Sequence, residues 1–230
     1  MAIIVVGGST RGAGKTALVC ALIRALPDMP WMAIKISSHE HGERKPVWEE
    51  TQAGEETDTA RYLAAGAARA FLVSAGNSDL TTESDLACAL DELWPNFGRG
   101  SNLFFESNRV VHHVRPNVCL MIHAVPQRAL PLPERKPSFI AALAHADAMV
   151  ALAAADGVIP DRLRLPGQDA KPIFNLMELG KISPQMMEWL RPRLGSMSRD
   201  LTRQNSPRAD ADQIDSVQID SVRPDSVRPD

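Results

Sequence analysis

The residues best suited to chemistry lie in the segment GGSTRGAGKT, which runs from Gly7 to Thr16. A glycine-rich turn lets backbone N–H groups point at an anion, and a lysine directly after it reaches the outer phosphates of a nucleotide. The threonine that follows supplies a hydroxyl for Mg²⁺. The segment is therefore predicted to be a phosphate-binding loop. The expected contact residues are Gly8, Ser9, Gly12, Ala13, Gly14, Lys15 and Thr16.

One position of this loop departs from the strict spacing G-x-x-x-x-G-K-[ST]. That spacing places the first glycine at position 9, where this chain has Ser9, and Gly8 lies one residue earlier. Two explanations are open: the chain enters the turn differently, or Ser9 adopts an ordinary φ there.

Phosphate chemistry also requires carboxylates that hold Mg²⁺. Glu106 ends the apolar run NLFFE, at the edge of a parallel sheet where ligands bind, and Asp58 begins a helix with Arg61 one turn later. We predict catalytic roles for Lys15, Glu106 and Asp58, metal contacts for Thr16, Asp58 and Glu106, and phosphate binding by Arg61. The purely structural alternatives are a surface Glu106, Asp58 as a helix cap and Arg61 as a solvated side chain.

A second polar cluster, His39, Glu40 and His41, follows the second predicted strand. Its position suits a substrate or a metal ion. The three residues are adjacent, however, and metal-binding histidines on a helix are spaced four apart. A polar loop without chemistry is the competing interpretation.

The elements around these residues alternate between apolar strands and helices. A buried strand over 2–6 precedes the loop, and a helix over 16–26 follows it. The segment 37–56 is polar and is predicted to be a long surface loop. Further strands are expected at 31–36, 70–74, 102–106, 118–122, 148–152 and 172–176, and further helices at 58–68, 82–94, 138–145 and 184–194. The pattern predicts an α/β P-loop NTPase fold, with six or seven mostly parallel strands and helices on both faces.

The end of the chain differs in composition from the rest. We expect one nucleotide-binding domain over 1–195 and a disordered tail over 196–230, which ends in DSVRP-type repeats. Such a polar five-residue repeat buries too little surface to order itself.

Composition excludes several classes of function. The net charge is −3 and aromatic residues make up 5%, so neither a basic surface nor a stacking platform for nucleic acid is expected. The sequence has no apolar run long enough for a membrane span. Cys20, Cys88 and Cys119 are far apart and lie in apolar runs, which predicts buried, reduced thiols in a cytoplasmic protein.

Four segments together resemble the molybdopterin-guanine dinucleotide biosynthesis protein B family, over roughly the first half of the chain and up to about residue 155. They are STRGAGKT, AIKISSHEHG, DTARYLAAGA and NLFFES. The corresponding residues are Lys35, His39 and His41, then Asp58, Arg61 and Ala65 to Ala67, then Glu106. Thr59 and Ser107 stand where the family has serine and glycine.

The resemblance implies GTP binding with slow hydrolysis, a homodimer, and an accessory role beside the nucleotidyltransferase that makes the molybdenum guanine dinucleotide cofactor. The residues themselves leave GTP and ATP open, because the chain has no N-K-x-D motif. They also leave open an ATP-dependent kinase acting on a small molecule or lipid precursor, and an NTP-dependent metal chaperone that uses His39 and His41.

Overall fold

A computed structural model describes residues 1–37, 46–74, 83–98, 100–124, 137–152, 171–176, 178 and 180–195. His39, Glu40, His41 and the predicted tail over 196–230 lie outside this set, so those predictions stay predictions. Within the described residues, no helix is long and apolar enough to cross a bilayer.

The described strands form one eight-stranded sheet in the order β3-β4-β2-β5-β1-β6-β7-β8. All neighbouring pairs are parallel except β3 and β4. The strands are β1 Ile3–Gly8, β2 Trp31–Ser37, β3 Val47–Glu50, β4 Arg69–Ser74, β5 Asn102–Glu106, β6 Val118–Ala124, β7 Ala148–Leu152 and β8 Ile173–Leu176. The predicted fold class is thereby confirmed.

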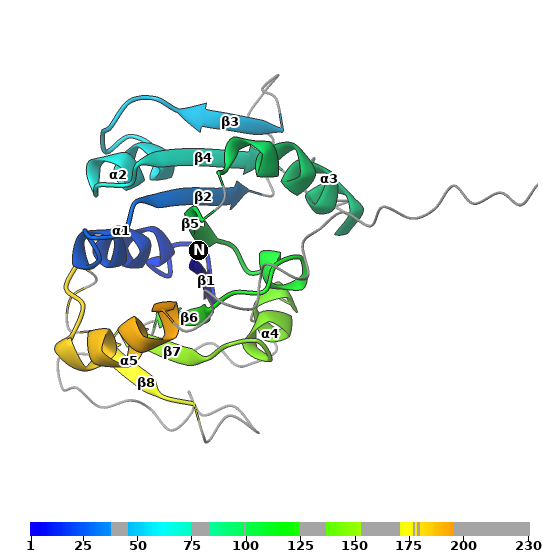
Figure 1. Ribbon diagram of the computed structural model, residues 1–230. Coiled ribbons are helices and arrows are strands. Elements are labelled where there is room, and N and C mark those ends of the chain that lie inside the picture. The colour runs from blue at the N-terminus through cyan, green and yellow to red at the C-terminus, as the bar shows by residue number, and fades with distance from the viewer. Residues whose placement is uncertain are drawn as a thin grey trace, which may run out of the picture. The chain divides into compact units, whose positions relative to one another are not determined.

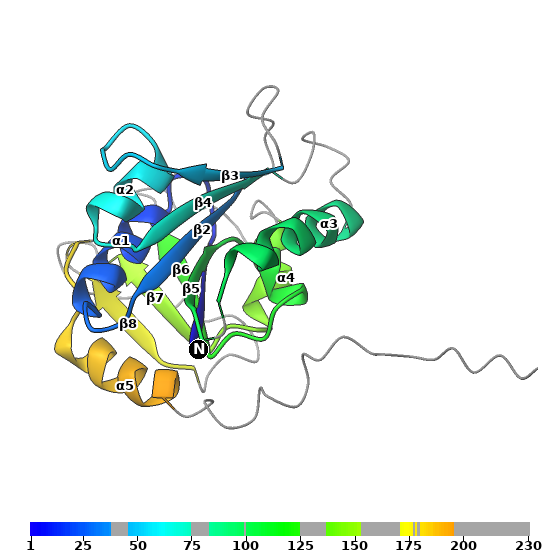
Figure 2. The same cartoon turned by 45° about the horizontal axis from the view of Figure 1, so that its top comes forward.

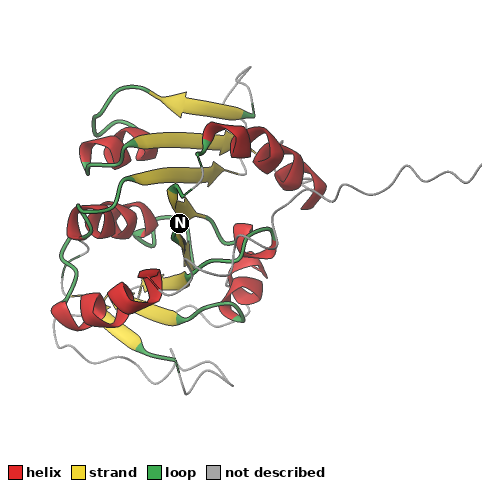
Figure 3. Ribbon diagram, viewed as in Figure 1, coloured by secondary structure: helices red, strands yellow, loops and turns green. Residues whose placement is uncertain are grey.

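Helices cover both faces of this sheet, as the two views of the ribbon and the colouring by element show (Figures 1, 2 and 3). The helices α1, α2 and α5 lie on one face, and α3 and α4 lie on the other. Their bounds are α1 Lys15–Ala25, α2 Asp58–Ala64, α3 Glu83–Leu93, α4 Pro137–Leu143 and α5 Pro184–Gly195. Two short 3₁₀ helices lie at Trp94–Asn96, directly after α3, and at Val110–His112, after β5.

Strand periodicity explains the two apolar layers. Ile4 and Val6 of β1 pack toward α1, whereas Ile3 and Val5 pack toward α3 and α4. Because a strand buried on both faces needs apolar residues at every position, β1 reads as an unbroken apolar run. Each such side chain contributes about 1.5–3 kcal/mol when fully buried.

The segment 37–56 was wrongly expected to be only a loop. Its residues 47–50, with the sequence VWEE, form β3, an edge strand antiparallel to β4. Two of the four residues are acidic, so the apolar alternation that identifies a strand is weak here, although edge strands commonly carry charge. The sheet therefore has eight strands where six or seven were expected.

Two smaller expectations also need correction. The predicted helix over 58–68 ends at Ala64, because Gly66 adopts a left-handed φ of 103° and the N–H of Ala67 closes back on the carbonyl of Tyr62 at 3.0 Å. Cys20 and Cys119 are buried as expected, but Cys88 lies on the exposed side of α3.

Candidate functional site

The predicted phosphate loop connects β1 to α1. Gly12 and Gly14 have φ values of 76° and 91°, a region that other residues rarely adopt, and Gly14 directly precedes the first turn of α1. The N–H groups at a helix N-terminus and the helix dipole favour an anion at this end. Lys15 begins α1, and its Nζ donates a hydrogen bond to the carbonyl of Thr10 at 3.2 Å, across the loop.

Asn108 holds the strand that enters the loop. Its Oδ1 accepts from the N–H of Gly8 at 2.7 Å, and its Nδ2 donates to the carbonyl of the same residue at 3.0 Å. A side chain at Gly8 would not fit, because a Cβ there would lie 2.9 Å from atoms of Ile122 and Lys15. Sequence reasoning missed Asn108; its position two residues after the acid that ends β5 was the available signal.

Ser9 continues the backbone of β1 where the strict motif has glycine. Its N–H donates to the carbonyl of Ile122 at 3.1 Å, which extends the pairing with β6. Its side chain is buried, and so is that of Ala13, whose N–H points to the carbonyl of Thr10 at 3.4 Å. Neither side chain is among those that line the pocket described below.

Glu106 lies beside the loop because β5 pairs with β1, with Glu106 opposite Val6. The hydroxyl of Thr16 donates to Oε2 of Glu106 at 2.8 Å. The buried hydroxyl of Tyr62 donates to the same oxygen. Burial and the nearby Glu106 carboxylate hold the pKa of Tyr62 well above its ordinary value, so it remains a donor. The strand acid and the loop threonine therefore form one cluster.

Lys35 joins this cluster from β2. Its Nζ contacts Glu106 and lies 3.0 Å from Oδ2 of Asp58. Burial disfavours the charged ammonium, but the two carboxylates outweigh burial and raise the pKa of Lys35 above its ordinary value. Burial likewise opposes the charge of Asp58, yet Lys35 and the Thr16 hydroxyl hold the pKa of Asp58 below its ordinary value. Lys35 entered the sequence analysis only through the family resemblance.

Arg61 faces the same pocket as Asp58. Its Nη1 lies 3.9 Å from Oδ1 of Asp58, and its Nε lies 3.3 Å from Oε2 of Glu55. Both Arg61 contacts are partly exposed, so they hold the side chain only weakly and leave it able to turn toward a ligand.

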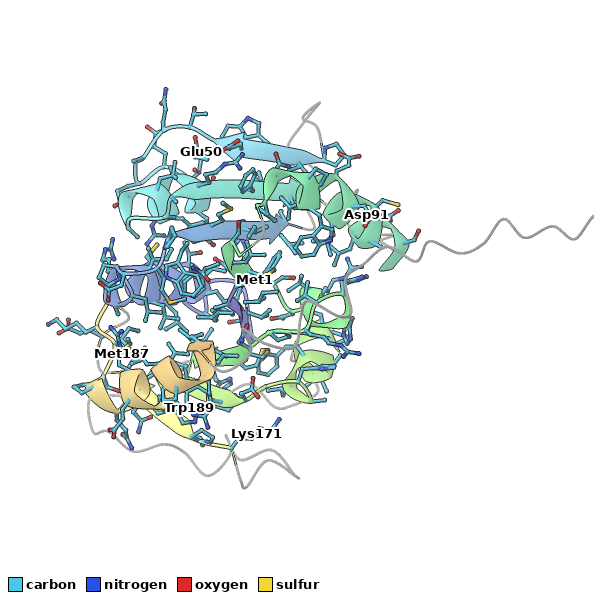
Figure 4. The ribbon with its side chains drawn as sticks, in the orientation of Figure 1. Met1, Glu50, Asp91, Lys171, Met187 and Trp189 are labelled. Carbon is cyan, nitrogen blue, oxygen red and sulfur yellow. The ribbon has the colours of Figure 1, made fainter. Side chains whose placement is uncertain are left out.

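Glu50 anchors the start of α2 and was not foreseen. Its Oε1 accepts from the N–H groups of Thr51 and Gln52, at 3.0 and 3.2 Å. Its Oε2 accepts from the hydroxyls of Thr57 and Thr59, at 3.1 and 3.3 Å. Thr57 in turn caps α2 by accepting from the N–H of Ala60. Figure 4 labels Glu50 at the end of β3, next to the turn that leads into the helix carrying Asp58.

Ser107, the residue after Glu106, stabilises the turn that follows β5. Ser107 accepts hydrogen bonds from the N–H groups of Arg109 and Val110, at 3.0 and 3.3 Å. This side-chain cap shapes the turn after β5, where the family pattern has glycine.

The oxygen atoms of Thr16, Asp58 and Glu106 fit Mg²⁺. This ion prefers hard oxygen ligands and is usually held by one or two carboxylates together with phosphate oxygens. Within the described part of the chain, no group of three or more His, Cys, Asp and Glu residues could hold a metal alone. Where one or two carboxylates hold a magnesium ion, waters and phosphate oxygens complete its coordination.

A pocket of about 760 Å³ unites these groups. Such a volume lies within the range of small-molecule sites. Of the predicted site residues, the ones that line it are Gly8, Gly12, Gly14, Lys15, Thr16, Asp58, Arg61 and Glu106. Further lining comes from Lys35, Ile36, Trp48 and Leu72 on the side of β2, β3 and β4.

The parallel sheet, the glycine-rich turn between β1 and α1, and the acid on the neighbouring strand define a P-loop NTPase fold. No protein-family model matches the sequence, and no curated protein matches it either. Solved structures with a similar fold include the "apo" form of LpxK from Aquifex aeolicus in complex with ATP, at 19% identity and a TM-score of 0.42. That match covers 76% of this chain and 53% of LpxK, so the chain spans about half of the length of LpxK. HypB from Helicobacter pylori, in complex with nickel, matches at 15% identity and a TM-score of 0.49, over 83% of this chain and 86% of HypB.

Proposed function

We propose that this protein binds a nucleoside triphosphate together with Mg²⁺ and slowly cleaves its terminal phosphoryl bond. The observation that carries the proposal is the 2.8 Å hydrogen bond between Thr16 and Glu106, directly beside the loop that ends in Lys15. A phosphate cradle, a lysine, a hydroxyl and a strand acid are the parts that phosphoryl transfer requires, and here they line one pocket.

Each residue has a distinct task in this proposal. The backbone at Gly12 and Gly14 cradles phosphate oxygens, and the ammonium of Lys15 leaves the carbonyl of Thr10 to bind the outer phosphates. Thr16, Glu106 and Asp58 supply the oxygens for magnesium, which would neutralise charge on the outer phosphates when bound. Lys35 offsets the negative charge of the two carboxylates, and it lowers the pKa of Asp58.

The finer assignment rests on the sequence resemblance. It favours GTP over ATP, a homodimer, and an accessory role beside the nucleotidyltransferase that makes the molybdenum guanine dinucleotide cofactor. Slow turnover agrees with such a role, because nucleotide occupancy alone can set affinity for a partner.

A second candidate is a kinase for a small molecule. The pocket continues beyond Lys35 to side chains of β3 and β4. These strands lie farther from the loop than a terminal phosphate bound there would extend. Space on that side would admit an acceptor other than water.

Turnover assays separate the two candidates and test the proposal. We expect the full-length protein to release phosphate slowly from GTP, less efficiently from ATP, and from neither once magnesium is chelated. An accessory protein forms the nucleoside diphosphate at this slow rate whatever small molecule is added, whereas a kinase forms it much faster with its acceptor. Magnesium-independent release, or no release from either nucleotide, would contradict the proposed hydrolysis.

A further inference from the structure

Four side chains form a row across the sheet, on the face that α1 and α2 cover. Glu106 of β5 pairs with Lys35 of β2, Lys35 pairs with Leu72 of β4, and Leu72 pairs with Trp48 of β3. Residues paired in register on adjacent strands point to the same face. All four also line the 760 Å³ pocket, so the row forms part of its wall.

The side chains of this row change from charged at one end to apolar at the other. Glu106 and Lys35 form the charged end, where Thr16 marks the expected position of magnesium. Leu72 and Trp48 form the apolar end, and both are partly exposed. Adjacent strands are about 4.8 Å apart, so the row is about 14 Å long and its apolar end lies about 10 Å from Lys35. A small molecule fits in that length.

The apolar end and the phosphate loop lie on opposite sides of β2 and β5. The loop follows β1, whereas Leu72 and Trp48 belong to β4 and β3, on the other side of these two strands, and both ends line the same pocket. The group that attacks a terminal phosphoryl approaches opposite to the leaving oxygen. An acceptor bound along this wall would therefore reach the phosphorus from the required side.

The side chains at the apolar end favour an apolar body. The pocket as a whole is lined by three carboxylates, Glu56, Asp58 and Glu106, and by five cations, Arg11, Lys15, Lys35, Arg61 and Arg109. The apolar end itself carries no charge, and its indole and leucine side chains offer contact area to an apolar or aromatic body.

We propose that the apolar end of the row binds a phosphoryl acceptor: a small molecule with an aromatic or aliphatic body and a free hydroxyl group. This inference rests on the proposed cleavage of a nucleoside triphosphate at the loop and develops the second candidate function, the kinase. The hydroxyl oxygen forms a bond to the terminal phosphorus, and the bond from that phosphorus to the oxygen bridging it to the next phosphate breaks. The hydroxyl proton passes to water. The products are a nucleoside diphosphate and a phosphate monoester.

The test uses benzyl alcohol as the probe, with benzoate as an analogue that lacks the alcohol hydroxyl, on the full-length protein with Mg²⁺ and GTP or ATP. Phosphorus NMR follows benzyl phosphate and the nucleoside diphosphate, and nucleotide affinity is measured separately. We expect benzyl alcohol to accelerate diphosphate release and to yield benzyl phosphate, and benzoate to do neither. Trp48→Ala should weaken the dependence on benzyl alcohol by about tenfold, and Trp48→Phe should restore most of it.

Trp189→Phe is the matched control, because Trp189 lies on α5, at the opposite end of the sheet from β3 (Figure 4). This variant should respond to benzyl alcohol like the unmodified protein. If the nucleotide binds but benzyl alcohol neither accelerates release nor becomes phosphorylated, the acceptor site is refuted while the proposed nucleotide function stands. The acceptor site is also refuted if benzoate gives the same response as benzyl alcohol. It is refuted likewise if Trp48→Ala responds to benzyl alcohol like the unmodified protein. Failure of both nucleotides to bind would instead refute the proposed function.

Discussion

The hydroxyl of Thr16 donates a 2.8 Å hydrogen bond to the carboxylate of Glu106, although the two residues are 90 positions apart in the chain. The contact exists because β5 lies next to β1, so the acid that ends one strand meets the first turn of the helix that follows the other. The carboxyl-terminal ends of parallel strands lie at one edge of the sheet, where ligands bind in this class of fold.

The first prediction concerns Glu106. Glu106→Gln removes the charge that balances Lys35 and that would help to hold magnesium, so turnover should fall by about a hundredfold or more. The half-saturating magnesium concentration should rise in the same variant. Glu92→Gln, on the exposed side of α3, is the control. An unchanged magnesium dependence in Glu106→Gln would show that this carboxylate has no part in metal binding.

The second prediction compares two adjacent glutamates of β3. Glu50→Gln leaves the hydroxyl of Thr57 and the buried hydroxyl of Thr59 poorly paired and should cost about 1–3 kcal/mol of unfolding free energy. Glu49→Gln weakens only the partly exposed pair with Arg69, which contributes at most about 1 kcal/mol.

If Glu50 also positions Asp58, its replacement should lower the turnover number more than it weakens nucleotide binding. Chemical denaturation and steady-state kinetics measure the two effects. Equal stability losses in the two variants, with turnover intact, would contradict a positioning role.

Much of the fold could be predicted because buried parallel strands are apolar throughout. The runs at β1, β5 and β7 are examples, and each lies within about two residues of its expected position. The strand β3 could not be found this way, since VWEE is short, half acidic and defined by its pairing with β4. Long-range pairing of this kind leaves little local signal.

The candidate site was predictable to a similar extent. Lys15, Thr16, Glu106 and Asp58 follow from motif spacing and strand ends, and the structure brings them to one pocket. Tyr62 and Asn108 were missed because the packing of distant segments sets their partners, which are 44 and 100 residues away in the chain. The partners of Glu50 are near in the chain, at most 9 residues away, but they meet it only because the chain turns between β3 and α2.

The third prediction uses two glycines with positive φ. Gly12 and Gly100 have φ values of 76° and 91°, and a Cβ at either would meet no atom within 4 Å. Replacing either glycine with alanine should therefore strain the backbone and lower the free energy of unfolding by a similar amount, about 1–2 kcal/mol. Thermal unfolding measures this loss. Only Gly12→Ala should also weaken nucleotide binding. Equal affinity in both variants would argue against a cradle formed by this loop.

The fourth prediction concerns pH. The folded-state pKa of Asp58 is lowered, so its ion pair stabilises the protein above the unfolded value, near 3.8, and that contribution is lost as the pH falls through the folded value. The raised pKa of Lys35 acts in the opposite direction, since its contribution is lost only as the pH rises above 10.5 and through the folded value.

Urea unfolding of the protein and of Asp58→Asn measures this effect. The gap between their unfolding free energies should be constant from about pH 6 to 9 and should shrink below about pH 4. A gap that persists at low pH would mean that the Asp58 carboxylate contributes through packing and not through its charge.

The most direct test of the central claim is equilibrium binding of GTP and of ATP, with Mg²⁺, to the full-length protein and to two lysine variants. Lys15→Ala removes the ammonium of the phosphate loop. Lys181→Ala removes an exposed lysine that is paired only with a surface glutamate among the contacts described, Glu178. We predict that the unmodified protein and Lys181→Ala bind at least one nucleotide equally well, and that Lys15→Ala binds it about ten- to a hundredfold more weakly. If neither nucleotide binds the unmodified protein, or if Lys15→Ala binds as tightly as Lys181→Ala, the segment from Gly7 to Thr16 is not a nucleotide site.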